Sequence, residues 1–213
     1  MKTDDLISML AGGVAPVDRG LLAKRFALAV IIAGWGSLVM VLAIFGARPD
    51  LSVVSRTPLF WAKIALPLCL AVGSLWMVTR LARPGVSAGS GRWVVSAGVL
   101  VVWLAGLYAL TQAEPDTRVA MIFGRTWRTC AFNITLLAIP GFISIFWALR
   151  SMAPTRLSVA GACGGLLAGS VATIAYCLHC PEMEIPFWGV WYLLGLLLST
   201  LIGALIGPRV LRW

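Results

Sequence analysis

Residues 157–178, LSVAGACGGLLAGSVATIAYCL, form a long apolar run without a single charged side chain. A helix needs roughly 20 such residues to cross the hydrocarbon core of a bilayer. Glycine recurs every four residues at Gly161, Gly165 and Gly169, and this spacing is typical of a helix face on which another helix packs closely. The run therefore predicts a transmembrane helix with a tight neighbour, and packing within one chain is favoured over a dimer.

Five further runs have the same character, and they cover residues 26–46, 59–79, 93–110, 130–149 and 187–207. The whole chain of 213 residues is 60% hydrophobic and only 12% charged, whereas the apolar share of a soluble domain is about half. Only helices and closed barrels satisfy their backbone in lipid. We therefore predict an all-α integral membrane bundle of six transmembrane helices over residues 26–213, after a cytoplasmic N-terminal segment, residues 1–25.

The basic residues predict the orientation of this bundle. If the connectors alternate between the two sides, 11 of the 17 lysines and arginines fall on the side of the two termini. Because Lys and Arg concentrate in cytoplasmic loops, both termini should be cytoplasmic. The net charge of +9 is thus an orientation signal, and direct binding of nucleic acid is not expected.

Three of the five cysteines, Cys130, Cys177 and Cys180, lie at the predicted outer ends of their helices. In bacteria that side is oxidising, so a thiol pair there can form a disulfide. Three interpretations stay open: a redox pair of Cys130 with Cys180 or Cys177, a site for a thiophilic metal ion, and plain buried thiols. The metal site would use Cys130, Cys180 and His179, with Cys177 as a further candidate ligand.

The residues around Cys180 carry weaker signals. His179, the one histidine of the chain, would lower the pKa of a neighbouring thiol if it were protonated. Pro181 is expected to stop the preceding helix and to leave Cys180 near its last turn. Glu182 and Glu184 are expected in a solvated outer loop, or as groups that attract cations. Lys63 is expected near the outer end of its span.

The N-terminal segment predicts a short amphipathic helix. Thr3 can cap it, the acidic pair Asp4 and Asp5 lies in its first turn, and Gly12 and Gly13 can end it. One face is apolar and is formed by Leu6, Ile7, Met9 and Leu10. Such a helix can lie on membrane lipid or bind a protein. Helices that lie on lipid usually carry Lys or Arg on the polar face, so acids favour a protein partner through Asp4, Asp5, Leu6, Ile7 and Leu10.

Other functional classes are less well supported by the sequence. Transporters usually carry polar or charged groups near the bilayer midplane, and the six runs have few. A membrane thiol-disulfide oxidoreductase of the DsbB type would use Cys130 with Cys177 and Cys180, but it would need a second dithiol and a quinone site. No catalytic residue is identified and no cofactor is required, so we do not expect an enzyme.

Several motifs, taken together and in order, resemble the NrsF family. They are Met1 to Ile7, Trp127-Arg128-Thr129-Cys130, Ala153-Pro154-Thr155-Arg156, Leu178-His179-Cys180-Pro181-Glu182, and the end from Trp191-Tyr192 to Leu211-Arg212-Trp213. The resemblance implies a six-helix anti-sigma factor of the bacterial inner membrane. It implies that the partner is an extracytoplasmic-function sigma factor, released on envelope stress such as metals or oxidants, with a thiophilic metal ion as one inducer. The two functional cysteines of the family match Cys130 and Cys180, and Cys177 is an addition to its pattern.

Overall fold

The structure is a computed structural model that describes residues 3–12 and 20–212, without the side chain of Leu10. The described residues form helices and no strand. The expected positions Lys2, Gly13, Arg19 and Trp213 lie outside the described residues, as does any contact of the Leu10 side chain. The elements in chain order are α1 (Thr3–Ala11), α2 (Leu21–Met40) with a π-helical end η1 (Val41–Phe45), α3 (Leu51–Val54), α4 (Pro58–Leu81), α5 (Gly91–Gln112), α6 (Pro115–Phe123), α7 (Trp127–Leu137), α8 (Ile139–Arg150), α9 (Leu157–Tyr176), α10 (Ile185–Phe187), the π-helical η2 (Trp188–Tyr192) and α11 (Leu193–Val210).

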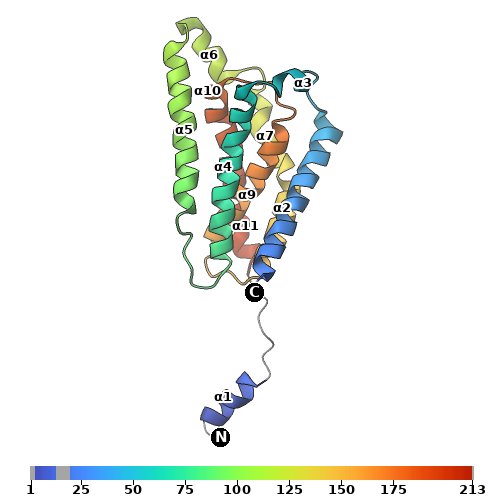
Figure 1. Ribbon diagram of the computed structural model, residues 1–213, viewed down its shortest axis with the longest axis vertical. Helices are drawn as coiled ribbons and strands as arrows, with labels where there is room; N and C mark the ends of the chain where they lie inside the picture. The colour runs from blue at the N-terminus through green and yellow to red at the C-terminus, as the bar shows by residue number, and fades with distance from the viewer. Residues whose placement is uncertain (1–2, 13–19, 213) are drawn as a thin grey trace.

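Six of the described helical segments are long and apolar enough to cross a membrane, which agrees with the predicted number of spans. They lie side by side, with the beginning of α2 and the end of α11 at the same end of the bundle (Figure 1). We call this the proximal end. The opposite end, which we call the distal end, carries α3, α6 and α10 (Figure 1).

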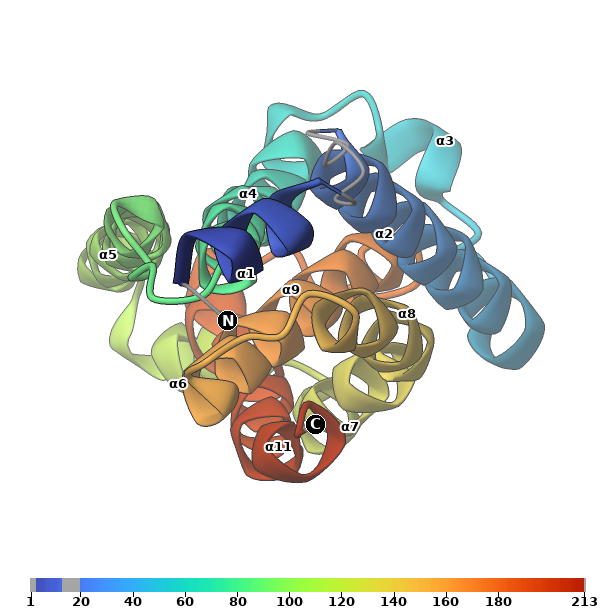
Figure 2. The same cartoon turned by 90° about the horizontal axis from the view of Figure 1, so that it is seen from below.

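Helix α9 occupies the centre of the bundle, and α5 lies at its periphery (Figure 2). Small residues explain why α9 is so closely surrounded. A Cβ atom added at Gly161 would overlap the carbonyl oxygen of Gly203 on α11, and one at Gly165 would overlap the carbonyl oxygen of Ser199. The predicted glycine face is therefore used within the chain, against α11, which confirms the preference for packing within one molecule.

The fourth span differs from the prediction. The expected helix over residues 130–149 is two helices, α7 and α8, that meet at Ala138. Pro140 is in the first turn of α8, where its missing N–H costs nothing, and it blocks continuation of the preceding helix. Pro67 has no such effect, because α4 continues through it. The fifth span also ends earlier than expected, at Tyr176 rather than at Leu178.

The long connector before α7 contains a helix that the sequence did not predict. Helix α6 packs over the distal end, where the indole Nε1 of Trp191 donates a 2.8 Å hydrogen bond to the carbonyl oxygen of Ile122. The rings of Phe123, Trp127 and Trp191 lie against one another, with centroids 5.2–6.0 Å apart. The connector between α5 and α7 is thus ordered as a helix at the distal end of the bundle.

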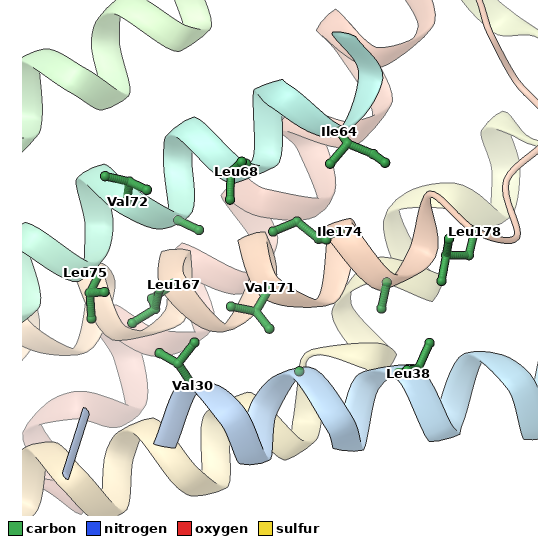
Figure 3. Close-up of a pocket in the computed structure, with 13 residues that line it drawn as sticks. Val30, Leu38, Ile64, Leu68, Val72, Leu75, Leu167, Val171, Ile174 and Leu178 are labelled. Carbon is green, nitrogen blue, oxygen red and sulfur yellow. The ribbon is translucent and has the colours of Figure 1, made fainter. Parts of the chain in front are cut away.

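An apolar cavity of about 450 Å³ lies between α2, α4 and α9. Figure 3 shows its lining residues, which include Val30 and Leu38 from α2, Leu68 and Leu75 from α4, and Val171 from α9. None of the lining residues is charged or polar. The cavity therefore offers no group for chemistry, and the candidate site must be sought elsewhere.

Helix α1 forms where it was predicted, with Thr3 as its first residue rather than its cap, and it stands apart from the bundle (Figure 1). The carbonyl oxygen of Asp4 accepts a 2.6 Å hydrogen bond from the Ser8 hydroxyl inside the helix. The apolar side chains of Leu6, Ile7 and Met9 are exposed. The expected apolar face is therefore present and unoccupied among the described residues.

Candidate functional site

The structure brings Cys130 and Cys180 into contact at the distal end. Cys130 lies one turn into α7, and Cys180 lies in the connector between α9 and α10, which we call the 177–184 loop. The thiol of Cys130 donates a hydrogen bond to the sulfur of Cys180. Both residues are buried, and both thiols are free. Of the two partners that the sequence left open for Cys130, the structure pairs it with Cys180.

The sulfur of Cys180 is surrounded by hydrogen-bond donors. Besides the Cys130 thiol, the Tyr192 hydroxyl and the backbone N–H of Glu182 donate to it, and the Lys63 ammonium acts on it through space. These groups lower the pKa of the Cys180 thiol below its ordinary value, with the hydrogen bond from Cys130 as the largest cause and burial opposing it. Of the two thiols, Cys180 is thus the one whose surroundings favour the thiolate form.

Cys177 lies in the same layer but in a different environment. Its thiol is 4.0 Å from the Tyr192 hydroxyl oxygen, and burial raises the pKa of this thiol to about 12. A thiol that stays protonated is a poor nucleophile and a poor metal ligand. Burial thus favours the protonated thiol at Cys177, in contrast to Cys180. The remaining cysteines lie inside helices, Cys69 in α4 and Cys163 in α9.

Two cations bind backbone carbonyl oxygens of the 177–184 loop. The Lys63 ammonium on α4 donates hydrogen bonds of 2.7 Å and 2.8 Å to the carbonyl oxygens of Cys180 and Glu182. The Arg48 guanidinium, between η1 and α3, donates to the Cys180 carbonyl oxygen at 3.3 Å. It also forms a two-pronged pair with Asp50, with both N–O distances 2.7 Å, and this lowers the pKa of the Asp50 carboxyl.

Glu182 fastens the loop to the beginning of α7. Its Oε1 accepts hydrogen bonds from the backbone N–H groups of Arg125 and Thr126 at 2.7 Å and 3.1 Å, and from the Thr126 hydroxyl at 3.3 Å. The expectation of a solvated Glu182 is thus wrong, because its carboxylate satisfies donors that the start of a helix leaves free. Glu184, in contrast, is exposed as expected.

His179 takes a different role from that of a ligand in this conformation. Its Nδ1 lies 3.0 Å from the carbonyl oxygen of Gly46, and its ring lies 5.1 Å from that of Phe45, between centroids. Across the part of the chain that the structure describes, no three His, Cys, Asp or Glu residues gather into a group that could hold a metal ion. The expected metal site of Cys130, Cys180 and His179 stays a prediction, and the geometry favours the two thiols alone.

Several residues of the site were not identified from the sequence. In the sequence, Tyr176 and Tyr192 look like ordinary members of apolar runs. In the structure, Tyr176 is hydrogen-bonded to Cys130, and its hydroxyl oxygen accepts a 3.4 Å hydrogen bond from the Asn133 amide. Tyr192 ends the π-helical turn η2, and π-helical turns are frequent at functional sites. Of these residues, Lys63 is the one that the sequence could have identified, because an ionisable residue inside an apolar span marks a functional position by default.

Comparison with known proteins places these residues in a family context. The sequence model of the NrsF family, described as "Negative regulator of sigma F", matches residues 10–213. A protein of Azospira oryzae named "Probable anti-sigma-F factor NrsF" is 43% identical over 216 aligned residues and is covered completely, as is this chain. The "Anti-sigma-F factor NrsF" of Caulobacter vibrioides is 39% identical over 217 aligned residues, also with complete coverage of both chains. No solved structure matches the chain.

Proposed function

The chain belongs to the NrsF family of negative regulators of sigma F, and we propose that it is an inner-membrane anti-sigma factor whose distal thiol pair is a redox sensor. It holds an extracytoplasmic-function sigma factor at the cytoplasmic face and releases it when Cys130 and Cys180 form a disulfide. The contact between these two thiols is the observation that carries the sensing part. Membership in a family of regulators argues against the oxidoreductase and transporter alternatives.

The direction of the bundle follows from its charges. The proximal end carries Lys24, Arg25, Arg80, Arg150 and Arg209, among others, and an excess of Lys and Arg is typical of the cytoplasmic side. The distal end then faces the periplasm. The thiol pair lies where oxidants arrive, and the termini lie where a sigma factor is found.

The sigma factor is proposed to bind α1 and the proximal loops. The exposed apolar side chains of Leu6, Ile7 and Met9 need a partner in water, and an amphipathic helix with apolar anchors at this spacing fits into a groove of a protein. Asp4 and Asp5 in its first turn add a negative charge that a basic surface of the partner would recognise.

The sensing chemistry is a two-electron oxidation with a hydroperoxide as the oxidant. The Cys180 thiolate attacks one oxygen of hydrogen peroxide, forms a sulfenic acid and expels hydroxide. The Cys130 thiol then attacks the sulfenic sulfur, the S–S bond forms and water leaves. Because both thiols are buried, the oxidant reaches them only when the 177–184 loop opens.

The disulfide restricts how α7 and α9 can be placed relative to each other. It joins α7 covalently to the loop that follows α9, and α9 is packed on α11 with almost no space between their glycines. A modification shifts an equilibrium only as far as it distinguishes the two states. The disulfide favours the arrangement in which the distal ends of α7 and α9 are drawn together, and packed helices carry this shift to the proximal end.

Co-purification tests the binding part of this proposal. The intact chain, solubilised in mild detergent, should retain an extracytoplasmic-function sigma factor of the same cell, and a variant without residues 1–24 should not. If the intact chain retains no sigma factor, the proposed function is wrong. Exposure of the loaded complex to Cd²⁺ in place of peroxide tests the metal ion as inducer. Release that requires both Cys130 and Cys180 would support it.

A further inference from the structure

Lys63 is buried in a way that needs an explanation. Its side chain has an exposed fraction of 0%, and it lies within the first two turns of α4. Removing an ammonium group from water costs several kcal/mol unless an opposite charge and hydrogen bonds compensate. Lysine is therefore almost never fully buried without a partner.

Among the described residues, the neighbours of Lys63 supply hydrogen bonds but no carboxylate that forms an ion pair with it, and the Asp50 carboxylate acts on it only through space. Its ammonium binds two carbonyl oxygens and lies 5.7 Å from the centre of the Tyr192 ring. Among the described residues, the ion pair formed at this end is that of Arg48 with Asp50. The Asp50 carboxylate is held by Arg48, so no carboxylate of the described residues is in direct contact with the Lys63 ammonium.

The sulfur of Cys180 is the group near Lys63 whose surroundings favour a negative charge. Three donors converge on this sulfur: the Cys130 thiol, the Tyr192 hydroxyl and the Glu182 N–H. Convergence of several donors on one buried atom stabilises its charged form. Lys63 at the same time grips the carbonyl oxygens of Cys180 and Glu182, so the cation and the sulfur are held on the same short stretch of loop.

We propose that Lys63 is a positioning residue of the sensor: its ammonium is the counter-charge of the Cys180 thiolate, and disulfide formation leaves that ammonium without one. This rests on the proposed function. In the oxidation by hydrogen peroxide, the negative charge of Cys180 departs as hydroxide, and the second step releases neutral water. The disulfide is neutral, so Lys63 becomes an unpaired buried cation, which is strongly destabilising.

The Lys63 ammonium that has lost its counter-charge affects α4, the helix that carries it. This helix packs against both α5 and the central α9, and its last turn carries Arg80 at the proximal end. A movement that lets the Lys63 ammonium reach water displaces α4 relative to α9. The oxidation of two thiols on α7 and on the 177–184 loop is in this way transmitted to a helix that contains neither thiol.

A double-mutant cycle on stability tests the charge pairing without any sigma factor. Lys63→Gln keeps an N–H₂ donor and removes the charge, and Cys180→Ser removes the thiolate. Cys180→Ser should lower the Tm in detergent clearly when Lys63 is present and little in the Lys63→Gln background, because only the first protein holds a stranded cation. Equal losses in both backgrounds would overturn the proposal.

A spectroscopic measurement covers the case in which a Lys63 variant does not fold. The ultraviolet absorbance of the thiolate should be present at neutral pH in the intact protein and absent in Cys180→Ser. Lys63→Arg, which keeps the charge, should keep the signal, and Lys63→Gln should lose most of it. A missing thiolate signal in the intact protein refutes the pairing by itself.

Release of the sigma factor tests the transmission. Lys63→Gln should form the disulfide more slowly because it holds less thiolate, so release is compared at an equal fraction of disulfide, where only the intact chain should release its sigma factor. Arg56→Gln is the matched control, because it removes an exposed cation between α3 and α4 at the same end of the bundle, and it should release normally. Release by Lys63→Gln equal to that of the intact chain would overturn the transmission role. If the intact chain itself fails to release on oxidation, the proposed function fails instead.

Discussion

The Glu182 carboxylate controls access to the thiol pair, and its removal offers a quantitative test. Glu182→Ala deletes the bonds to the Arg125 and Thr126 N–H groups, which are 2.7 Å and 3.1 Å long. A hydrogen bond to a charged group contributes about 1.5–3 kcal/mol when it is partly shielded. Since Glu182 is only half-buried, we discount each of the two bonds to about 1–1.5 kcal/mol and expect opening of the 177–184 loop to become easier by about 2–3 kcal/mol in total.

The lower free energy of opening the 177–184 loop predicts a faster alkylation of Cys180. Each 1.4 kcal/mol changes an equilibrium about tenfold, so the open fraction, and with it the alkylation rate of Cys180, should rise roughly 30-fold to 150-fold. The assay follows labelling of Cys180 by N-ethylmaleimide, with mass spectrometry to identify the modified residue. Glu184→Ala is the matched control, because Glu184 is exposed. Labelling of Glu182→Ala at the rate of the intact protein, or equal acceleration in the control, would refute the reasoning.

Three further predictions concern packing, pH and the partner helix. Gly203→Ala should lower the Tm in detergent by several degrees, because its Cβ would overlap a backbone oxygen of α9, whereas at Gly34 the nearest side-chain atom is 3.9 Å away and Ala should be tolerated. Cys130→Ala removes the largest cause of the lowered Cys180 pKa, so the rise of the alkylation rate with pH should move to higher pH. In the intact protein, the lowered pKa of Cys180 contributes stability that is fully present above the unfolded pKa near 8.5 and is lost as the pH falls through the folded pKa. An unchanged pH profile would contradict the assignment of Cys180 as acceptor. Ile7→Asp should weaken sigma-factor retention at least tenfold in a pull-down, and unchanged retention would exclude α1 from the interface.

The number of spans and the layer of the cysteines followed from the sequence because both depend on length and hydropathy. The apolar run 157–178 and its glycine spacing predicted α9 and a closely packed neighbouring helix. The positions of Cys130 and Cys180 at the ends of their apolar runs predicted that both lie on the same side of the bundle. These features are local, so a pattern along the chain is enough to predict them.

The contacts around the pair could not be predicted in the same way. Whether Cys130 faces Cys180 or Cys177 depends on where α9 ends, and it ends at Tyr176, before the proline that was expected to stop it. Glu182 was expected in solvent because nothing in its neighbourhood along the chain shows that it meets the start of α7, more than 50 residues earlier. Helix α6 was missed, although Pro115 stands in its first turn, where proline is favoured.

The central claim is that the Cys130–Cys180 disulfide releases the sigma factor. The direct measurement titrates the purified complex with hydrogen peroxide and compares, at each step, the fraction of this disulfide found by mass spectrometry with the fraction of sigma factor that remains bound. The account predicts that the two change together, and that a Cys130→Ala, Cys180→Ser variant keeps its sigma factor throughout. Full disulfide formation with the sigma factor still bound, or release from the double variant, would contradict it.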